Sequence, residues 1–168
     1  MKTYKMEKRV FPDFINIIKS KGKLFGPVKQ KSKYSFEEIN NSSELDFDYH
    51  RTILGIKKFL TPPRYKTMQF NKEGSEDIFD GDETNIVMGV HPCDIHSVKI
   101  LDRLFMANIK DPYYSKKRAN LIIIGHSCLP DDKCLCQSTG TDMVEDGFDL
   151  FPINTFYDQH ITRCISDD

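Results

Sequence analysis

Two short, nearly uninterrupted apolar runs are the clearest feature of the hydrophobic pattern. They cover residues 85–90 and 121–125, and such runs are typical of strands buried on both faces of a sheet. Between them, residues 97–107 predict a helix whose apolar face carries Val98, Leu101, Leu104 and Phe105. Strand, helix and strand in this order predict a βαβ unit with parallel strands and a right-handed crossover.

The pattern is weaker elsewhere. Residues 11–19 predict a first helix, because apolar side chains recur there at helical spacing. Residues 34–46 and 51–60 carry no decisive pattern. The remaining predictions are a strand broken by a turn at 24–28, an acidic surface loop at 71–83, and strands at 148–153 and 161–165.

These elements predict an α/β fold with a mainly parallel sheet. The chain of 168 residues is long enough to bury a core and short enough to form one domain. We therefore expect a single domain over residues 1–168. Its first part, 1–84, holds the N-terminal helix and an irregular segment, and its second part, 85–168, holds the βαβ unit and most of the cysteines.

Composition excludes several classes of function. The net charge of −1 argues against nucleic acid as a partner, because phosphate binding needs a surplus of positive charge. No apolar run approaches the roughly 20 residues of a membrane span, and the first residues lack the features of a signal peptide. We therefore expect a cytoplasmic protein, in which clustered thiols are more often metal ligands or redox groups than disulfides.

Four of the five cysteines lie in the two loops that follow the apolar strands. Cys93 follows the first strand, and Cys128, Cys134 and Cys136 follow the second. The carboxyl ends of neighbouring parallel strands meet at the same edge of a sheet, where ligands bind. We therefore expect the four thiols to form one metal site at that edge.

Three chemistries compete for these thiols. An iron–sulfur cluster takes four thiolates from separate loops, whereas structural zinc usually takes paired Cys-x2-4-Cys knuckles. The spacing here, Cys-x5-Cys-x-Cys with a distant fourth, has no paired knuckles. This favours a cluster over zinc, and disulfides come last because of the expected compartment.

Other polar residues near the loops receive lesser roles. His91, His96 and His126 are predicted to surround the ligands or lie on the surface, and His50 and His160 receive no role. Asp94 is predicted to cap the following helix, and Cys164 to be a buried, inert thiol. Residues 111–118 predict a surface turn, with phosphate, flavin or acidic-partner binding as the alternative. No phosphate-binding glycine motif or catalytic constellation is present.

The chain resembles a known family in the order of its motifs. It is similar, over about residues 24–160, to the iron–sulfur beta subunit of cytosolic nickel–iron hydrogenases (sulfhydrogenases) and to the related A subunit of anaerobic sulfite reductase. The motifs that carry the resemblance cover residues 89–94, 101–105, 111–118, 128–130, 134–140 and 147–150, with weaker matches at 26–27 and 57–62.

The resemblance implies an electron-transfer subunit. In that family this region precedes a ferredoxin-like segment with two 4Fe-4S clusters, and its own cysteines are placed to hold a further 4Fe-4S cluster. Position by position, the implied ligands are Cys93, Cys128, Cys134 and Cys136.

Three features depart from the family. His91 replaces a typical arginine, Leu135 replaces a typical phenylalanine, and the sequence stops at Asp168 without a ferredoxin segment. We therefore expect either a naturally short or split version of the subunit or a fragment of one.

The expected function is one-electron transfer within a cytoplasmic complex, with other redox subunits as partners and no bond-making reaction on this chain. The alternatives are a zinc-stabilised interaction or assembly module, and a family member that acts as a regulator or scaffold with an empty site.

Overall fold

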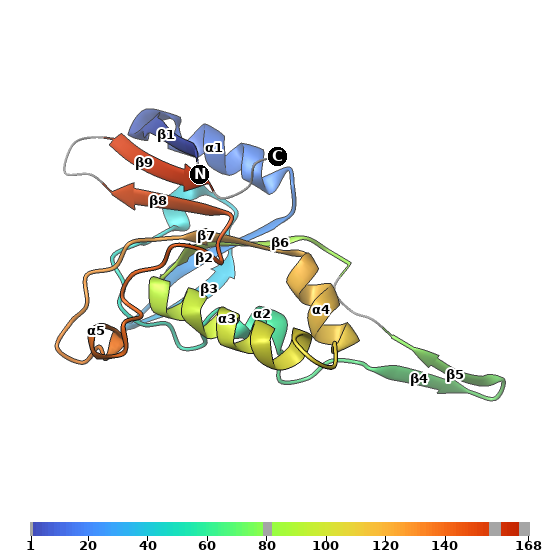
Figure 1. The fold of residues 1–168 in the computed structure, drawn as a ribbon. Coiled ribbons are helices and arrows are strands. Elements are labelled where there is room, and N and C mark those ends of the chain that lie inside the picture. The colour runs from blue at the N-terminus through green and yellow to red at the C-terminus, as the bar shows by residue number, and fades with distance from the viewer. Residues whose placement is uncertain (1, 79–81, 155–158, 165–168) are drawn as a thin grey trace.

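The computed structural model describes residues 2–78, 82–154 and 159–164. In these residues, helices cover both faces of a seven-stranded sheet (Figure 1). Across the sheet the strands are β1 (Lys2–Glu7), β9 (Gln159–Cys164), β8 (Leu150–Asn154), β7 (Leu121–Gly125), β6 (Asn85–Val90), β2 (Lys23–Gln30) and β3 (Lys33–Glu38). The helices are α1 (Phe11–Lys19), α2 (Lys57–Leu60), α3 (Pro92–Met106), α4 (Pro112–Ala119) and α5 (Cys136–Thr139).

The four central strands confirm the predicted α/β class. Strands β2, β6, β7 and β8 are parallel, and α3 and α4 lie between β6 and β7 in the chain, as the βαβ unit requires. The outer strands are antiparallel: β3 pairs with β2, and β9 pairs with both β8 and β1. The sheet is therefore parallel where the cysteine loops leave it.

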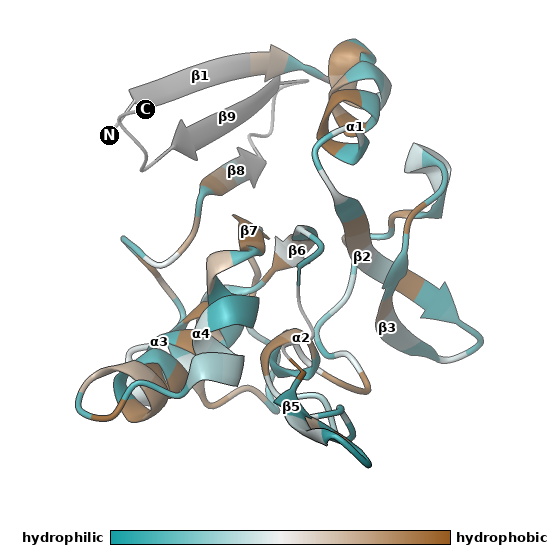
Figure 2. Ribbon diagram, turned by 90° about the vertical axis from the view of Figure 1, so that its right-hand side faces the viewer, coloured by the Kyte–Doolittle hydropathy of each residue, from teal (hydrophilic) through white to brown (hydrophobic). Residues whose placement is uncertain are grey.

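The central strands divide their side chains between two cores. Ile86 and Met88 pack toward α1, whereas Val87 and Val90 pack toward α2, α3 and α4. Figure 2 shows apolar residues along β7, in contrast to the mainly hydrophilic β5. The alternation on β6 breaks at Gly89, where the register shifts and φ is +86°. Glycine suits this bulge because other residues rarely adopt such a φ.

Several predicted boundaries are confirmed, and others are wrong. The predicted helix at 11–19 and the strands at 85–90 and 121–125 are confirmed. The strand predicted as broken at 24–28 is continuous through Pro27 as β2, which is possible because proline still permits extended backbone. Helix α3 begins at Pro92, five residues before the predicted start, since proline suits the first helical position.

Residues 71–83 are not simply a loop. The chain from Met68–Asn71 (β4) turns into Gly74–Asp77 (β5) and forms a separate two-stranded hairpin that projects from the body (Figure 1). Its strands are exposed throughout, so no buried face marks them in the sequence.

Residues 111–118 are also not a surface turn. They begin α4, whose N-cap Asp111 accepts a hydrogen bond from the backbone N–H of Tyr114 at 2.7 Å. Asp102 on α3 accepts from the Tyr114 hydroxyl at 2.6 Å and from Arg118 Nε at 3.1 Å. These side chains join α3 to α4, so two of the residues considered for phosphate binding have structural partners.

Two ambiguous and two C-terminal stretches remain. Residues 34–46 contain most of β3 and a 3-10 turn (Ser42–Glu44), and residues 51–60 contain the short α2. The strands predicted at 148–153 and 161–165 correspond to β8 and β9. The predictions for the Cys164 thiol and His160 concern side chains outside the described ones. No helix in the described ranges is long and apolar enough to cross a membrane.

Candidate metal centre

The two cysteine loops leave adjacent strands and are joined at their bases. Cys93 lies in the first turn of α3, directly after β6, and Cys128 is the third residue after β7. The backbone N–H of His126 donates to the carbonyl of Val90 at 2.8 Å, which holds the start of one loop against the start of the other.

All four predicted cysteines line one small cavity. Cys93, Cys128, Cys134 and Cys136 share it with His50, His91, Pro92, Pro130, Thr141 and Asp142. Cys136 begins α5, and its carbonyl accepts from the backbone N–H of Thr141 at 2.8 Å, which closes the loop. The structure thus brings the four thiols to one place, while their role as metal ligands stays a prediction.

The thiols influence one another electrostatically. Burial raises the pKa of Cys128 to about 11, and the neighbouring Cys134, Cys93 and Cys136 add to the increase. Burial also raises the pKa of Cys93, as do Asp94 and Cys136. Four thiolates here would repel one another in the absence of a cation, so a bound positive charge would favour their deprotonation.

The donor set suits a thiophilic iron–sulfur group better than a hard cation. In the described residues, no group of three or more histidine, cysteine, aspartate or glutamate side chains is arranged to hold a single metal ion. The four thiols nevertheless line one cavity and come from the two loops that leave β6 and β7. They therefore fit the cluster that the family resemblance implies in number and in chemical type.

Arg51 and Asp131 form an ion pair beside Cys134. Arg51 Nη2 also lies 3.7 Å from Cys134 Sγ, in hydrogen-bonding geometry. The pKa of Asp131 is lowered, first by a hydrogen bond from the Cys134 thiol and then by the backbone N–H of Lys133 at 3.0 Å and by Arg51. A positive side chain and a carboxylate therefore fix the position of one thiol.

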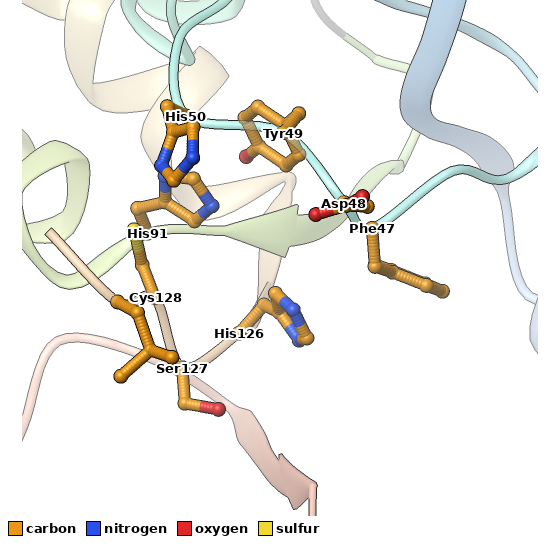
Figure 3. Close-up of a pocket in the computed structure, with 9 residues that line it drawn as sticks. Phe47, Asp48, Tyr49, His50, His91, His126, Ser127 and Cys128 are labelled. Carbon is orange, nitrogen blue, oxygen red and sulfur yellow. The ribbon is translucent and has the colours of Figure 1, made fainter. Parts of the chain in front are cut away.

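A second pocket, of about 360 Å³, adjoins the thiols and contains three imidazoles (Figure 3). It is lined by Phe47, Asp48, Tyr49, His50, His91, His126, Ser127, Cys128 and Leu129. The His91 ring stacks on Tyr49, with centroids 4.1 Å apart and planes 14° apart, and the Phe47 and His126 rings are 5.0 Å apart. The pKa of His91 is lowered to about 4, mainly by burial and to a smaller extent by His126 and His50.

The histidine predictions are only partly accurate. His91 and His126 are buried around the thiols rather than on the surface, and His50, which received no role, lines the thiol cavity. His96 is a peripheral residue whose Nε2 is 2.8 Å from the Met143 carbonyl oxygen. Asp94 lies in the first turn of α3, but His91 is the N-cap residue, so the predicted capping role is wrong.

Sequence reasoning also missed Tyr49 and Arg51. Both belong to an irregular segment without a hydrophobic period, and they reach the site only through the fold. The dense aromatic and histidine run at residues 47–50 was the available signal.

Comparisons with known proteins support the resemblance seen in the motifs. No protein-family model matches the chain, and no solved structure matches it. A curated protein, Sulfhydrogenase 2 subunit beta of Pyrococcus furiosus, is 46% identical over 151 residues. The match covers 90% of this chain and 45% of the relative, so the chain spans slightly less than half of that protein's length. This partial match confirms the predicted resemblance: across the region they share, the chain is related to a sulfhydrogenase beta subunit.

Proposed function

We propose that this chain is an electron-transfer part of a hydrogenase-type redox complex and carries one 4Fe-4S cluster. The observation that carries the proposal is the convergence of Cys93, Cys128, Cys134 and Cys136 on one cavity at the carboxyl ends of two parallel strands. The name of the relative, a sulfhydrogenase subunit, supports a redox role within a larger assembly.

The chain's own residues would hold the group and set its surroundings. When bound, the cluster supplies the capacity to accept and release single electrons. The four cysteines would provide the thiolate ligands, and Arg51 would direct an N–H toward the Cys134 sulfur. A hydrogen bond or positive charge near a ligand sulfur stabilises the more negative, reduced state.

Exposed apolar side chains lie in and shortly after the second cysteine loop and support docking of another redox subunit. Leu129, Leu135 and Met143 are 85%, 74% and 78% exposed. Leu135 lies between two of the cysteines. A partner that covered these apolar side chains would remove them from water and would lie close to the thiols. We therefore place the electron exit or entry of the complex at this edge.

Metal analysis of anaerobically purified protein tests the proposal. We expect about four iron and four acid-labile sulfide per chain, a broad visible absorbance that bleaches on reduction, and a paramagnetic resonance signal in the reduced state. Serine substitutions of Cys93, Cys128, Cys134 and Cys136 should each lower the iron content. Cys164→Ser is the matched control and should retain it.

Two outcomes would contradict electron transfer. One zinc per colourless chain would instead establish a zinc-stabilised interaction module. A chain that binds neither metal after anaerobic reconstitution with iron and sulfide would establish a scaffold or regulator with an empty site.

A further inference from the structure

His91 contains a buried nitrogen that has no hydrogen-bond partner. The residue is 2% exposed, and its Nε2 is one of two buried side-chain nitrogen or oxygen atoms without a partner in the described part of the chain. Leaving such an atom unpaired is unfavourable, and buried polar atoms are nearly always paired in folded proteins. The position of Nε2 therefore indicates a partner that is not one of the chain's own described atoms.

The imidazole is held in place and has little freedom to find another partner. It stacks on the Tyr49 ring at 4.1 Å, and the Tyr49 hydroxyl donates to the Gly89 carbonyl at 2.5 Å. His91 itself connects β6 to α3 and is followed by Pro92 at the start of the helix. The ring and its support are thus fixed at the end of β6, directly before the first turn of α3 that carries Cys93.

The surroundings of the ring point to sulfur. His91 lines the cavity that the four thiols share and also the neighbouring pocket, and Cys128 lines both as well. Figure 3 shows His91, His50 and Cys128 together on one side of the pocket. An imidazole N–H donates readily to a thiolate or sulfide, and N–H donors to sulfur are one means by which proteins tune such centres.

We propose that His91 donates a hydrogen bond from Nε2 to an inorganic sulfide of the iron–sulfur centre beside Cys128, and thereby raises the reduction potential of the centre. This inference rests on the proposed function. The added electron increases the negative charge on sulfur, so a fixed donor stabilises the reduced state more than the oxidised state. His91 is then a positioning and tuning residue rather than a ligand.

Two substitutions test the donor separately from the ring. His91→Phe keeps an aromatic ring against Tyr49 but removes Nε2, whereas His91→Gln places an amide N–H near the same position. The midpoint potential of the reconstituted protein is measured by redox titration monitored by paramagnetic resonance. We expect a shift to a more negative potential in H91F and a potential close to that of the wild type in H91Q. His96→Phe, which removes the peripheral imidazole, should leave the potential unchanged.

A direct measurement complements the potentials. Labelling histidine with 15N should change the pulsed paramagnetic resonance spectrum of the wild type, and this change should disappear in H91Q. If the labelled and unlabelled wild-type proteins gave the same spectrum, the proposal would be overturned, even if H91F failed to fold.

The outcomes separate this inference from the proposed function. A cluster-containing H91F protein with an unchanged potential would overturn the hydrogen bond alone, as would equal shifts in H91F and H91Q, which would indicate a packing effect. Wild-type protein without iron and sulfide would overturn both proposals.

Discussion

At the scale of single residues, Gly125 shows how tightly the centre of the sheet is packed. A Cβ added there would lie 2.2 Å from Phe151 Cδ2 and 2.5 Å from Phe151 Cε2. Phe151 is buried in the core on β8, so its ring has little room to move. We expect Gly125→Ala to lower the free energy of unfolding by about 1–3 kcal/mol, the usual cost of overpacking. Urea denaturation measures this cost.

The clash itself is tested by a second substitution. Because the added methyl group meets the Phe151 ring, Phe151→Leu should recover part of the loss in the G125A background. Strictly additive costs in the double variant would contradict the packing explanation.

The buried His91 gives the metal-free chain a defined response to pH. Its pKa falls from 6.5 to about 4, mainly through burial, so below pH 6.5 the unfolded chain binds a proton that the folded chain does not. Stability is therefore lost as the pH falls from 6.5 toward 4. Between pH 7 and pH 5 we expect this residue to lower the free energy of unfolding by about 2 kcal/mol. Urea denaturation of the metal-free proteins at pH 7 and pH 5 should show a smaller loss of unfolding free energy in H91F than in the wild type. Equal losses in the two proteins would contradict this assignment to His91.

The grouping of the four cysteines could be predicted from the sequence, whereas the surroundings of the thiols could not. The four cysteines could be predicted as one site because each loop follows a strongly apolar strand, and parallel strands bring their ends together. The burial of His91 and the approach of Arg51 to Cys134 could not be predicted, since both depend on the path of an irregular segment that reaches the site from far away in the sequence.

At the scale of elements, the buried strands could be predicted more accurately than the exposed or polar elements. Strands β6 and β7 are covered on both faces and read as continuous apolar runs. Helix α4 has a polar composition and begins at Asp111-Pro112, an N-terminal signal that the charge pattern obscured. The outer antiparallel strands β1, β9 and β3 add pairings that the hydrophobic period of the sequence does not specify.

The β4–β5 hairpin provides a test of which elements stabilise the domain. Both strands are exposed throughout, and Phe70 is 75% exposed. An isolated two-stranded hairpin is marginally stable in water and contributes little to a core. We expect replacement of residues 69–76 by a short glycine–serine connection to change the free energy of unfolding by less than about 0.5 kcal/mol.

The substitution retains the base of the hairpin, where the Tyr113 hydroxyl donates to the Thr67 carbonyl at 2.9 Å. Iron content should also be unchanged in the shortened chain. A loss of several kcal/mol in urea denaturation would show that the hairpin supports the core after all.

At the scale of the whole molecule, the sheet and the thiol loop depend on different forces. The sheet buries two apolar cores, one against α1 and one against α2, α3 and α4. Residues 129–146 contribute one partly buried apolar side chain, Val144, to these cores. The loop is instead held by local hydrogen bonds, such as Cys134 N–H to the Asp131 carbonyl at 3.0 Å, and by the Arg51–Asp131 pair. Local opening should therefore begin in this loop.

Removal of the proposed cluster tests that division. Without a cation, the raised pKa of Cys128 reflects burial and repulsion by neighbouring thiols, and the proposed metal–thiolate bonds that would close the loop are absent. We expect anaerobic chelation to increase amide hydrogen exchange in residues 128–142, while β6 and β7 remain protected. Cys128→Ser should give the same pattern without a chelator, and Cys164→Ser, treated in parallel, should match the wild type. An equal loss of protection in β6 and β7 would show that the proposed cluster holds the whole domain together, as metals do in small metal-dependent folds. The stability of the sheet would then depend on the thiol site rather than on the two apolar cores.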